Sequence, residues 1–153
     1  MVGYRINKVE WDRQKNELQQ IRERVFVYEL HIPKRVEFDN LDELALHVLV
    51  TDDSFCPVAT ARLCNDGLIG RLAVLPDHRN RNVYCSLLNY IFDIAVEQGI
   101  ESISVNCVLH EVERFKRNGF IKQGNVFMEA GIPRQRMKCP VRCADTTPFT
   151  LVH

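Results

Sequence analysis

The stretch over residues 70–88 constrains the fold more than any other part of this chain. Its first part contains a continuous apolar run over 72–75 that is typical of a buried strand, and the run stops at Pro76 because proline cannot donate to a strand ladder. After a short polar loop, apolar side chains recur at helical spacing from Val83 until Gly99, a residue type that commonly follows the last turn of a helix. The stretch therefore predicts a buried strand, a loop and a long helix in direct succession.

The loop between that strand and that helix carries Arg79 and Arg81. The unpaired backbone N–H groups and the dipole at a helix N-terminus attract anions, and arginine binds phosphate through its planar fork of donors. We therefore expect this loop to hold an anionic group. The plainer interpretation is that both arginines are solvated charges of a turn.

Composition narrows the class of protein further. A length of 153 residues, 46% of them apolar, suits one domain with a sizeable core. The formal net charge of +0 does not favour nonspecific binding to nucleic acid. No apolar run approaches the roughly 18 residues that a membrane span needs, and the N-terminal segment lacks the apolar stretch of a secretory signal. We therefore expect a cytoplasmic protein with no nucleic-acid or membrane partner.

The cysteines and histidines form no familiar metal or redox motif. Neither a CxxC pair nor an HxxxH spacing occurs among the six cysteines and five histidines. Several of the cysteines fall within apolar strand or helix patterns, which favours reduced, buried thiols over disulfides. The sequence therefore predicts no metal site.

Hydrophobic periodicity predicts strands and helices in mixed order. The Asn-Asp-Gly sequence at 65–67 is typical of a hairpin turn, so the three strands around 44–75 are expected to be antiparallel. We expect a surface loop or short helix over 31–43, and a single domain over 1–141 followed by a tail over 142–153. The strands are predicted over 2–9, 44–51, 56–63, 68–75, 101–107, 120–127 and 136–141, and the helices over 12–30, 83–99 and 110–118.

The strand, loop and helix around Arg79 resemble the pyrophosphate-binding motif of the GNAT acetyltransferases. That motif has an arginine or glutamine, two residues, a glycine, one residue and then glycine or alanine, after a strand that ends near Val-x-Pro. Asn80, Asn82 and Tyr84 stand where small residues are usual. Because asparagine tolerates left-handed backbone angles, we expect the two asparagines to hold a similar loop, while the bulk of Tyr84 falls where a phosphate would approach the helix.

Three further stretches are similar to the small ElaA-like branch of that superfamily. Together with the loop they cover roughly residues 4–141 in the matching order. The resemblance implies an α/β fold, a GNAT fold with a central, mostly antiparallel sheet that splays at its fourth and fifth strands and is flanked by helices. The stretches are 21–29 followed by Pro33, Glu37, Asp39, Asp42 and His47; 110–120; and 128–133 followed by Met137.

The same resemblance implies an N-acetyltransferase. Such an enzyme moves an acetyl group from acetyl-CoA to a primary amine of a small molecule or peptide, by direct attack in a ternary complex. The co-substrate would contact the strand before the loop, the loop itself and the end of the fifth strand. The implied contacts are Leu72, Ala73, Val74, Arg79, Asn80, Arg81, Asn82, Val83, Tyr84 and Asn106.

Acetyl transfer to an amine needs a group that takes the proton of the amine. A carboxylate near the cleft does this directly or through water, and Glu37 and Glu29 are the first candidates, with Asp39 and His47 beside them. Each carboxylate is equally explained as an ordinary helix or loop charge, and His47 as a hydrogen-bonded core histidine.

The leaving CoA thiolate needs a proton in return. The tyrosine that usually supplies it in the family falls on Phe115, which has no transferable proton. His110 is the first candidate for this role because histidine donates a proton near neutral pH, and Cys107 and Tyr84 are the others.

Two alternatives to an active enzyme follow from these departures. Phe115 and the missing glycines favour a non-catalytic acyl-CoA-binding or regulatory module on the same fold. A third hypothesis is an interaction protein whose cleft is closed by Tyr84. The hairpin expected over 129–136 has an apolar flank and is a candidate homodimer contact.

Overall fold

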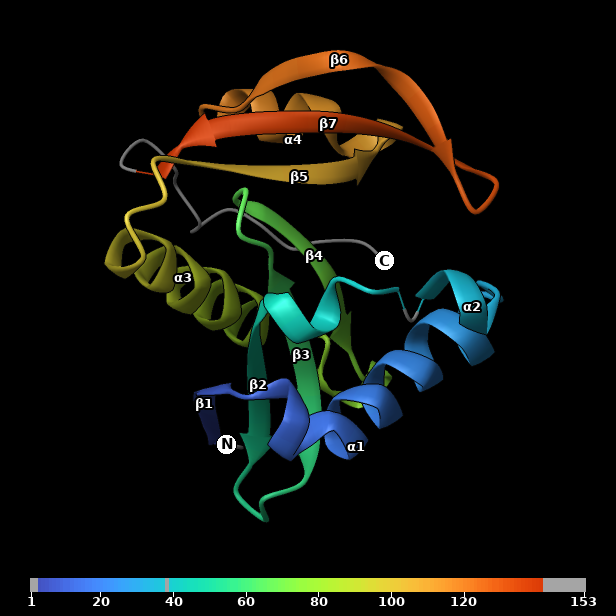
Figure 1. Cartoon of the computed structure of the whole chain (residues 1–153), viewed down its shortest axis with the longest axis vertical. Coiled ribbons are helices and arrows are strands. Elements are labelled where there is room, and N and C mark those ends of the chain that lie inside the picture. Colours follow the sequence, from blue (N-terminus) through green and yellow to red (C-terminus); the bar gives the residue numbers. More distant parts are fainter. Residues whose placement is uncertain (1–2, 38, 142–153) are drawn as a thin grey trace.

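In the computed structural model, which describes residues 3–37 and 39–141, the strands form one mixed sheet (Figure 1). Its order is β1-β2-β3-β4-β5-β7-β6, and every described pair is antiparallel except β4 with β5. The expected tail over 142–153 and residue 2 of the first expected strand lie outside the described residues. The strands are β1 Tyr4–Val9, β2 Leu46–Asp52, β3 Pro57–Leu63, β4 Leu68–Val74, β5 Ser102–Val108, β6 Ile121–Glu129 and β7 Ile132–Pro140.

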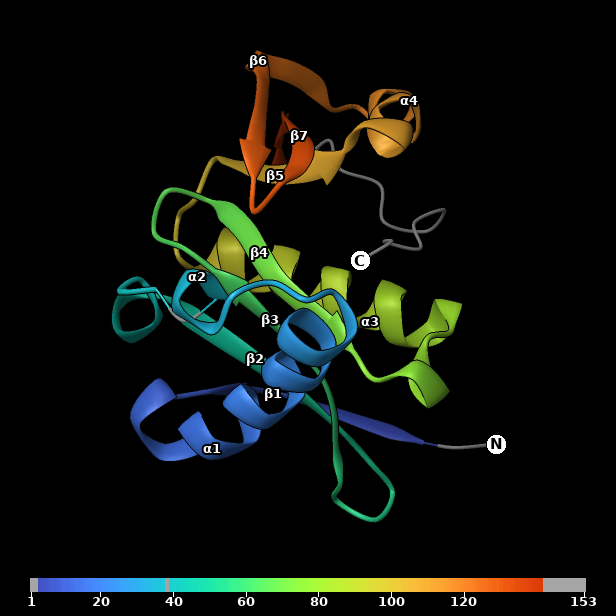
Figure 2. The same ribbon diagram turned by 90° about the vertical axis from the view of Figure 1, so that its right-hand side faces the viewer.

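Helices cover both faces of the first four strands (Figure 2). The helix α1 continues as a π-helical segment, η1, on one face, and the long helix α3 lies on the other. No helix in the described part of the chain is long and apolar enough to cross a membrane. The helical segments are α1 Trp11–Arg22, η1 Glu23–Glu29, α2 Lys34–Glu37, η2 Asp42–Leu44, η3 Pro76–His78, α3 Arg81–Glu97, η4 Leu109–Glu111 and α4 Val112–Arg117.

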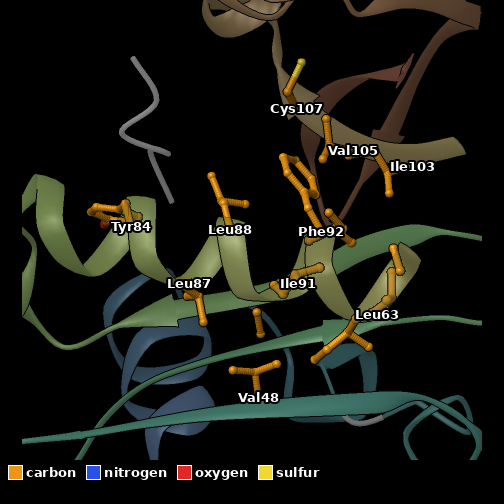
Figure 3. Close-up of a cluster of buried hydrophobic side chains, with 14 of the residues drawn as sticks. Val48, Leu63, Tyr84, Leu87, Leu88, Ile91, Phe92, Ile103, Val105 and Cys107 are labelled. Atoms are coloured by element: carbon orange, nitrogen blue, oxygen red, sulfur yellow. The ribbon is translucent and has the colours of Figure 1, made fainter. Parts of the chain in front are cut away.

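The strand periodicity divides the buried side chains between the two faces. Val48 packs with Leu87 and Ile91 of α3 (Figure 3), whereas its neighbour Leu49 packs with Leu18 of α1. Successive side chains of a strand point to opposite faces, so one apolar run of β2 serves both cores. Each fully buried leucine or isoleucine contributes about 1.5–3 kcal/mol to folding, which fixes both helices against the sheet.

The sheet opens between β4 and β5. The two strands pair only at Leu68 with Ser104 and at Ile69 with Val105. Beyond these pairs β4 carries a bulge against β3, where Arg71 has a φ of +49°, and the strands diverge (Figure 1). A bulge bends its strand and increases the local twist, so it accounts for the divergence. The expected splay of the fourth and fifth strands is confirmed.

Gly67 fixes the closed end of this opening. Its φ is +89°, and its carbonyl accepts a hydrogen bond of 3.0 Å from the Ser104 amide. A Cβ at this position would lie 2.3 Å from the Ser102 carbonyl oxygen. Only glycine therefore fits the turn that brings β4 beside β5.

The structure corrects three expectations. The segment 31–43 contains the expected short helix, α2, but it is not confined to the surface, because Glu37 and Asp42 are 2% and 3% exposed. The strands expected over 120–127 and 136–141 extend toward each other as β6 and β7 and meet at a tight turn of Ala130 and Gly131, both with positive φ. A hairpin was expected over 129–136, but periodicity did not extend the two strands into it, because its apolar and polar side chains alternate poorly.

Candidate active site

A cavity of about 450 Å³ lies where β4 and β5 diverge. Residues from η1, from the segment before η2, from β4, from β5 and from the β6–β7 hairpin line it. A cavity of this size accommodates a small-molecule substrate. Its charged and polar lining residues are Glu37, Asp39, Arg62, Arg71, Asn106, Glu111, Glu129, Arg134 and Arg136, and its larger apolar ones include Phe26, Leu30, Ile32, Leu41, Leu72, Phe115 and Phe127.

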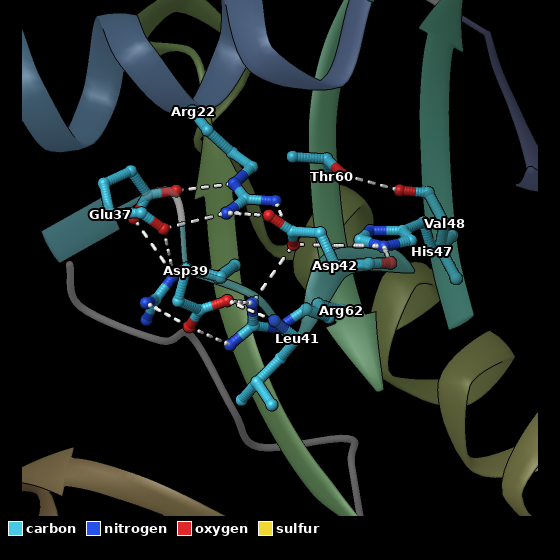
Figure 4. A network of polar contacts seen from close by, with 10 residues as sticks. Arg22, Glu37, Asp39, Leu41, Asp42, His47, Val48, Thr60 and Arg62 are labelled. Atoms are coloured by element: carbon cyan, nitrogen blue, oxygen red, sulfur yellow. Dashed lines mark hydrogen bonds and ion pairs between the residues drawn. The ribbon is translucent and has the colours of Figure 1, made fainter. Parts of the chain in front are cut away.

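One wall of the cavity is a buried network of ion pairs (Figure 4). The Arg22 guanidinium, 1% exposed, donates to Glu37 and, at 2.7 Å, to Asp42. The Arg62 guanidinium donates to Asp39 at 2.7 Å and to Asp42 at 3.1 Å. Removing one member would leave its buried partners with fewer opposite charges, so the network acts as one unit that ties the segment before η2 to α1 and β3.

Arg71 completes this network from the bulge of β4. Its guanidinium lies 3.1 Å from a Glu37 carboxylate oxygen and 3.0 Å from Asp39, and it also donates to the Glu37 carbonyl. Arg71 thus has a left-handed backbone at the point where β4 leaves β5, and its side chain connects this part of the sheet to the ion-pair network. Strand periodicity does not predict this role, because it assigns residues 68–75 to a regular strand without a bulge.

Burial and the arginines act in opposite directions on the two cavity carboxylates of this wall. Burial raises the pKa of Glu37 above its usual value, although Arg22 and Arg71 oppose the rise. Burial also acts to raise the pKa of Asp39, but hydrogen bonds from Arg62 and from the Leu41 amide, with the nearby positive charges, lower it overall. Glu37 is therefore the better proton acceptor of the two.

His47 is a core residue. It is 1% exposed, its Nε2 donates to the Asp42 carbonyl at 2.8 Å, and its ring lies on Trp11 with centroids 5.0 Å apart. Burial lowers its pKa, against the effect of the hydrogen bond to Asp42. It does not line the cavity, so we do not propose it as a base.

The other wall combines Cys107, Glu111 and Phe115 with two arginines of β7. Burial raises the pKa of the Cys107 thiol to about 11, so the thiol keeps its proton at neutral pH. Glu111 is 4% exposed and Phe115 3%, one helical turn further along. Arg136 donates to the Asn106 side-chain oxygen at 2.9 Å. Glu111 is a single charge after a strand and carries no periodic signal, and the two arginines lie within β7, where their position beside the cavity depends on the pairing of β7 with β5.

Only some of the expected site residues meet in this cavity. Glu37, Leu72 and Asn106 line it. Ala73 and Val74 are fully buried in the two cores next to it. The remaining expected residues, His110, Glu29, Arg79, Asn80, Arg81, Asn82, Val83 and Tyr84, are not among its lining residues.

Two of those residues form an ion pair of their own. Both terminal nitrogens of Arg79 donate to the two carboxylate oxygens of Glu29, at 2.7 Å and 2.6 Å, and its Nε donates to the Val74 carbonyl. Glu29 therefore ties the end of η1 to the loop before α3. His110 is 68% exposed at its side chain and lies beside the cavity, with its Nε2 3.7 Å from Glu111.

The loop before α3 differs from the expected conformation. Asn80 has an extended backbone, with φ of −127°, and caps α3 by accepting a 3.0 Å hydrogen bond from the Val83 amide. Asn82 lies inside the helix. The expectation that these asparagines replace glycine in left-handed angles is wrong, because Asn80 instead satisfies a helix N-terminal donor with its side chain. Tyr84 is 2% exposed and belongs to the core cluster of α3 (Figure 3), where burial raises its pKa.

The N-terminus of α3 nevertheless keeps features of an anion site. The helix has 17 residues, no acidic residue in its first turn, and the arginines at 79 and 81 beside it. These donors fit a diphosphate. Among the described residues no group of three or more His, Cys, Asp or Glu could hold a metal ion.

A mixed sheet that opens between two parallel strands onto a substrate-sized cavity, with a helix N-terminus after the first of them, defines an acyltransferase of the GNAT class. Residues 12–141 match the acetyltransferase (GNAT) domain family. The chain belongs to this family.

Individual relatives agree with the family match. The chain is 30% identical over 121 residues to YjcF of Bacillus subtilis (strain 168), described as an uncharacterized N-acetyltransferase, a match that covers 76% of this chain and 86% of YjcF. The fold is similar to that of Escherichia coli ElaA, with a TM-score of 0.75, 23% identity and coverage of 88% and 99% of the two chains. It is also similar to an acyl-CoA N-acyltransferase from Pseudomonas aeruginosa, with a TM-score of 0.78, 22% identity and coverage of 91% and 99%.

Proposed function

We propose that this GNAT acetyltransferase uses acetyl-CoA as its donor and acetylates a primary amine of a small molecule or peptide by direct attack in a ternary complex. The observation that carries the proposal is the opening between β4 and β5 onto the cavity, which leaves strand backbone from 70–72 beside a space large enough for both reacting groups. Holding a thioester and an amine together there supplies much of the rate.

The contacts of the CoA diphosphate fall at the N-terminus of α3 in this proposal. Arg79 and Arg81 supply positive charge and the helix supplies its dipole. Because Glu29 holds the Arg79 fork, a diphosphate competes with that carboxylate for the same donors. Asn106 and Leu72 line the cavity further along and are proposed contacts of the pantetheine arm.

Glu37 is the proposed general base. Of the two first candidates for the base it is the one that lines the cavity, and burial raises its pKa toward that of an amine. It accepts the proton of the amine directly or through water. Its carboxylate also holds Arg22 and Arg71, so Glu37→Gln is expected to lower both activity and stability.

The Cys107 thiol, which keeps its proton at neutral pH and lines the cavity, replaces His110 as the proposed donor to the leaving thiolate.

Two measurements test the donor and the reaction. Isothermal titration with acetyl-CoA, with adenosine diphosphate as the control for the nucleotide part alone, measures binding. A thiol-release assay over a panel of primary amines and peptides measures turnover. We expect saturable binding and release of CoA with at least one amine. No binding at millimolar acetyl-CoA would refute the proposal.

Phe115 supports the second candidate, a non-catalytic acyl-CoA-binding module. The phenylalanine lines the cavity, 3% exposed, and its ring packs edge-on against Phe120 at 5.1 Å. Binding of acetyl-CoA without turnover on any amine would favour this module. Turnover in the natural protein that Phe115→Tyr leaves unchanged would remove the main argument for it.

A further inference from the structure

On one wall of the cavity, the Glu111 carboxylate and the guanidinium groups of Arg134 and Arg136 form no ion pair with each other. Glu111 is 4% exposed, and its Oε2 is buried without a hydrogen bond. The cations nearest to this carboxylate are Arg114, 3.4 Å from Oε2 but without hydrogen-bond geometry, and His110, 3.7 Å from Oε1. A buried carboxylate oxygen without a donor costs free energy, so a ligand that supplies an N–H group would be stabilised there.

Arg134 shows the complementary deficiency. Its Nε is buried without a hydrogen bond, and its terminal nitrogen lies 3.5 Å from the Asn106 carbonyl. Arg136, two residues along the same strand and on the same face, donates to the side chain of Asn106. Neither arginine has an acidic partner among residues 3–37 and 39–141, although Glu129 also lines the cavity. Arg62 and Arg71 on the other wall, by contrast, are both paired with Asp39.

These two deficiencies occur in one place. Val108, at the end of β5, pairs with Arg134 and precedes Glu111 by one turn of η4. The charges of Glu111 and Arg134 both act on the Cys107 thiol, the first raising and the second lowering its pKa, after the larger effect of burial. A carboxylate and a guanidinium that act on the same thiol without pairing with each other can be bridged by a ligand that carries both charges.

We propose that Glu111, Arg134 and Arg136 recognise the acceptor as a zwitterion, a free α-amino acid whose ammonium group meets the carboxylate and whose carboxylate meets the two guanidinium groups. Arginine forks match carboxylates in a bidentate geometry. The apolar part of the cavity, with Phe26, Leu30 and Ile32, favours an apolar side chain such as that of phenylalanine or leucine. This inference rests on the proposed function and specifies its acceptor.

The natural protein tests the inference with matched acceptors. Phenylalanine is compared with phenethylamine and phenylalaninamide, and leucine with isoamylamine, at saturating acetyl-CoA. Phenethylamine and isoamylamine lack the carboxylate of the corresponding amino acid, and phenylalaninamide has a neutral amide in its place. We expect kcat/KM for the amino acid to exceed that for its partner about tenfold or more. Acetylation of the amines at equal or greater kcat/KM would overturn the zwitterion inference and leave the proposed transferase intact.

Variants then assign the carboxylate contact. Arg134→Gln should raise KM for phenylalanine about tenfold while KM for acetyl-CoA and for phenethylamine stays within twofold. Arg136→Gln should also raise KM for phenylalanine about tenfold and leave KM for phenethylamine within twofold, but because Arg136 also holds the side chain of Asn106, KM for acetyl-CoA is compared only in Arg134→Gln. Arg117→Gln removes the same charge from the exposed end of α4 and is the matched control. A rise in KM for acetyl-CoA with no change for phenylalanine in Arg134→Gln would instead assign this arginine to a phosphate of the co-substrate and overturn the inference.

Glu111→Gln tests the ammonium contact, with Glu113→Gln, two residues further along and exposed, as its control. We expect weaker binding of phenylalanine by Glu111→Gln, and unchanged binding of hydrocinnamate, which lacks the amine. Circular dichroism melts of every variant separate loss of folding from loss of recognition. Equal loss for both ligands in a folded variant would contradict the role of Glu111. Loss of acetyl-CoA binding by the natural protein would refute the proposed function itself, which no acceptor comparison does.

Discussion

Asn80, just before α3, has a structural role that differs from the one expected from the resemblance. Asn80 stands where a glycine is usual in the resemblance, but its side chain caps α3 through the Val83 amide at 3.0 Å. A helix N-cap of this type contributes about 1 kcal/mol. Asn80 was expected to replace the conformational freedom of a glycine, but its role in the structure is that of a hydrogen-bond acceptor.

We therefore predict that Asn80→Ala lowers the free energy of unfolding by about 1 kcal/mol, because one helix N-terminal donor loses its partner. Asn80→Asp keeps an acceptor at the same position and should restore most of the loss. Urea denaturation measures both, with Asn82→Ala as the control inside the helix. If Asn82→Ala proved as destabilising as Asn80→Ala, the cap would not be the cause.

The ion pair of Glu29 with Arg79 leads to a second prediction at this scale. Both side chains are partly exposed, so the pair adds less than about 1 kcal/mol to stability. Glu29→Gln should tighten acetyl-CoA binding severalfold, because the Arg79 fork is then available to phosphate, whereas Arg79→Gln should weaken it. Isothermal titration measures both affinities. Equal affinities in the natural protein and in Glu29→Gln would mean that Arg79 does not contact the co-substrate.

At the scale of elements, the opening between β4 and β5 depends on how the strands are joined at its closed end. The Gly67 carbonyl accepts a hydrogen bond from the Ser104 amide there, and the residue has a φ of +89°. A Cβ at Gly67 would lie 2.3 Å from the Ser102 carbonyl oxygen. In the described part of the chain, strand pairing between β4 and β5 is limited to the two residue pairs that follow. The turn before β4 therefore sets the geometry of the cavity.

We predict that Gly67→Ala destabilises the protein by more than the roughly 1 kcal/mol that a positive φ alone costs. Gly99→Ala is the matched control, because Gly99 has a φ of +72° and a Cβ there would meet no other atom within 4 Å. The excess of the first variant over the second in urea denaturation measures the backbone clash. Equal losses would show that the β4–β5 junction yields without cost.

The elements themselves were largely predictable from the sequence, and the site was predictable only in part. Periodicity located α3 and the strands around it because apolar spacing reports directly on burial. It could not locate Arg71, whose position depends on a bulge, or Glu111 and Arg134, which the pairing of β5 with β7 brings to the same cavity. The resemblance pointed to Glu37, whereas Glu29 and His110 lie outside the cavity for reasons of tertiary packing.

At the scale of the whole molecule, the buried charges join the N-terminal helices to the sheet. Arg22 and Arg62 share Asp42, whose carbonyl in turn accepts from His47 (Figure 4). The segment around η2 is thereby fixed against α1, β2 and β3 at once. Protonation of a group in this assembly is therefore expected to change the free energy of unfolding of the whole domain.

His47 provides the pH test of this assembly. Burial lowers its pKa below the usual 6.5, so the unfolded chain binds its proton more tightly than the folded one. Stability from this group is therefore present above pH 6.5 and is lost as the pH falls through the folded pKa, with a slope of at most about 1.4 kcal/mol per pH unit.

We predict that this slope becomes smaller in His47→Gln, which retains a donor for the Asp42 carbonyl. His31→Asn is the control, because His31 is exposed and asparagine tolerates its φ of +58°. Urea denaturation between pH 7 and pH 5 measures the slopes. A slope that is unchanged in His47→Gln but lost in His31→Asn would contradict the assignment.

The most direct test of the account is a crystal structure of the protein bound to CoA, because the central claim is that the parted edge of β4 and β5 receives an acyl-CoA. We predict density for the thiol end between β4 and β5 in the cavity and for the diphosphate at the N-terminus of α3, with the Arg79 fork turned from Glu29 to phosphate. A complex in which CoA lies elsewhere, with the cavity between these strands untouched, would contradict the claim.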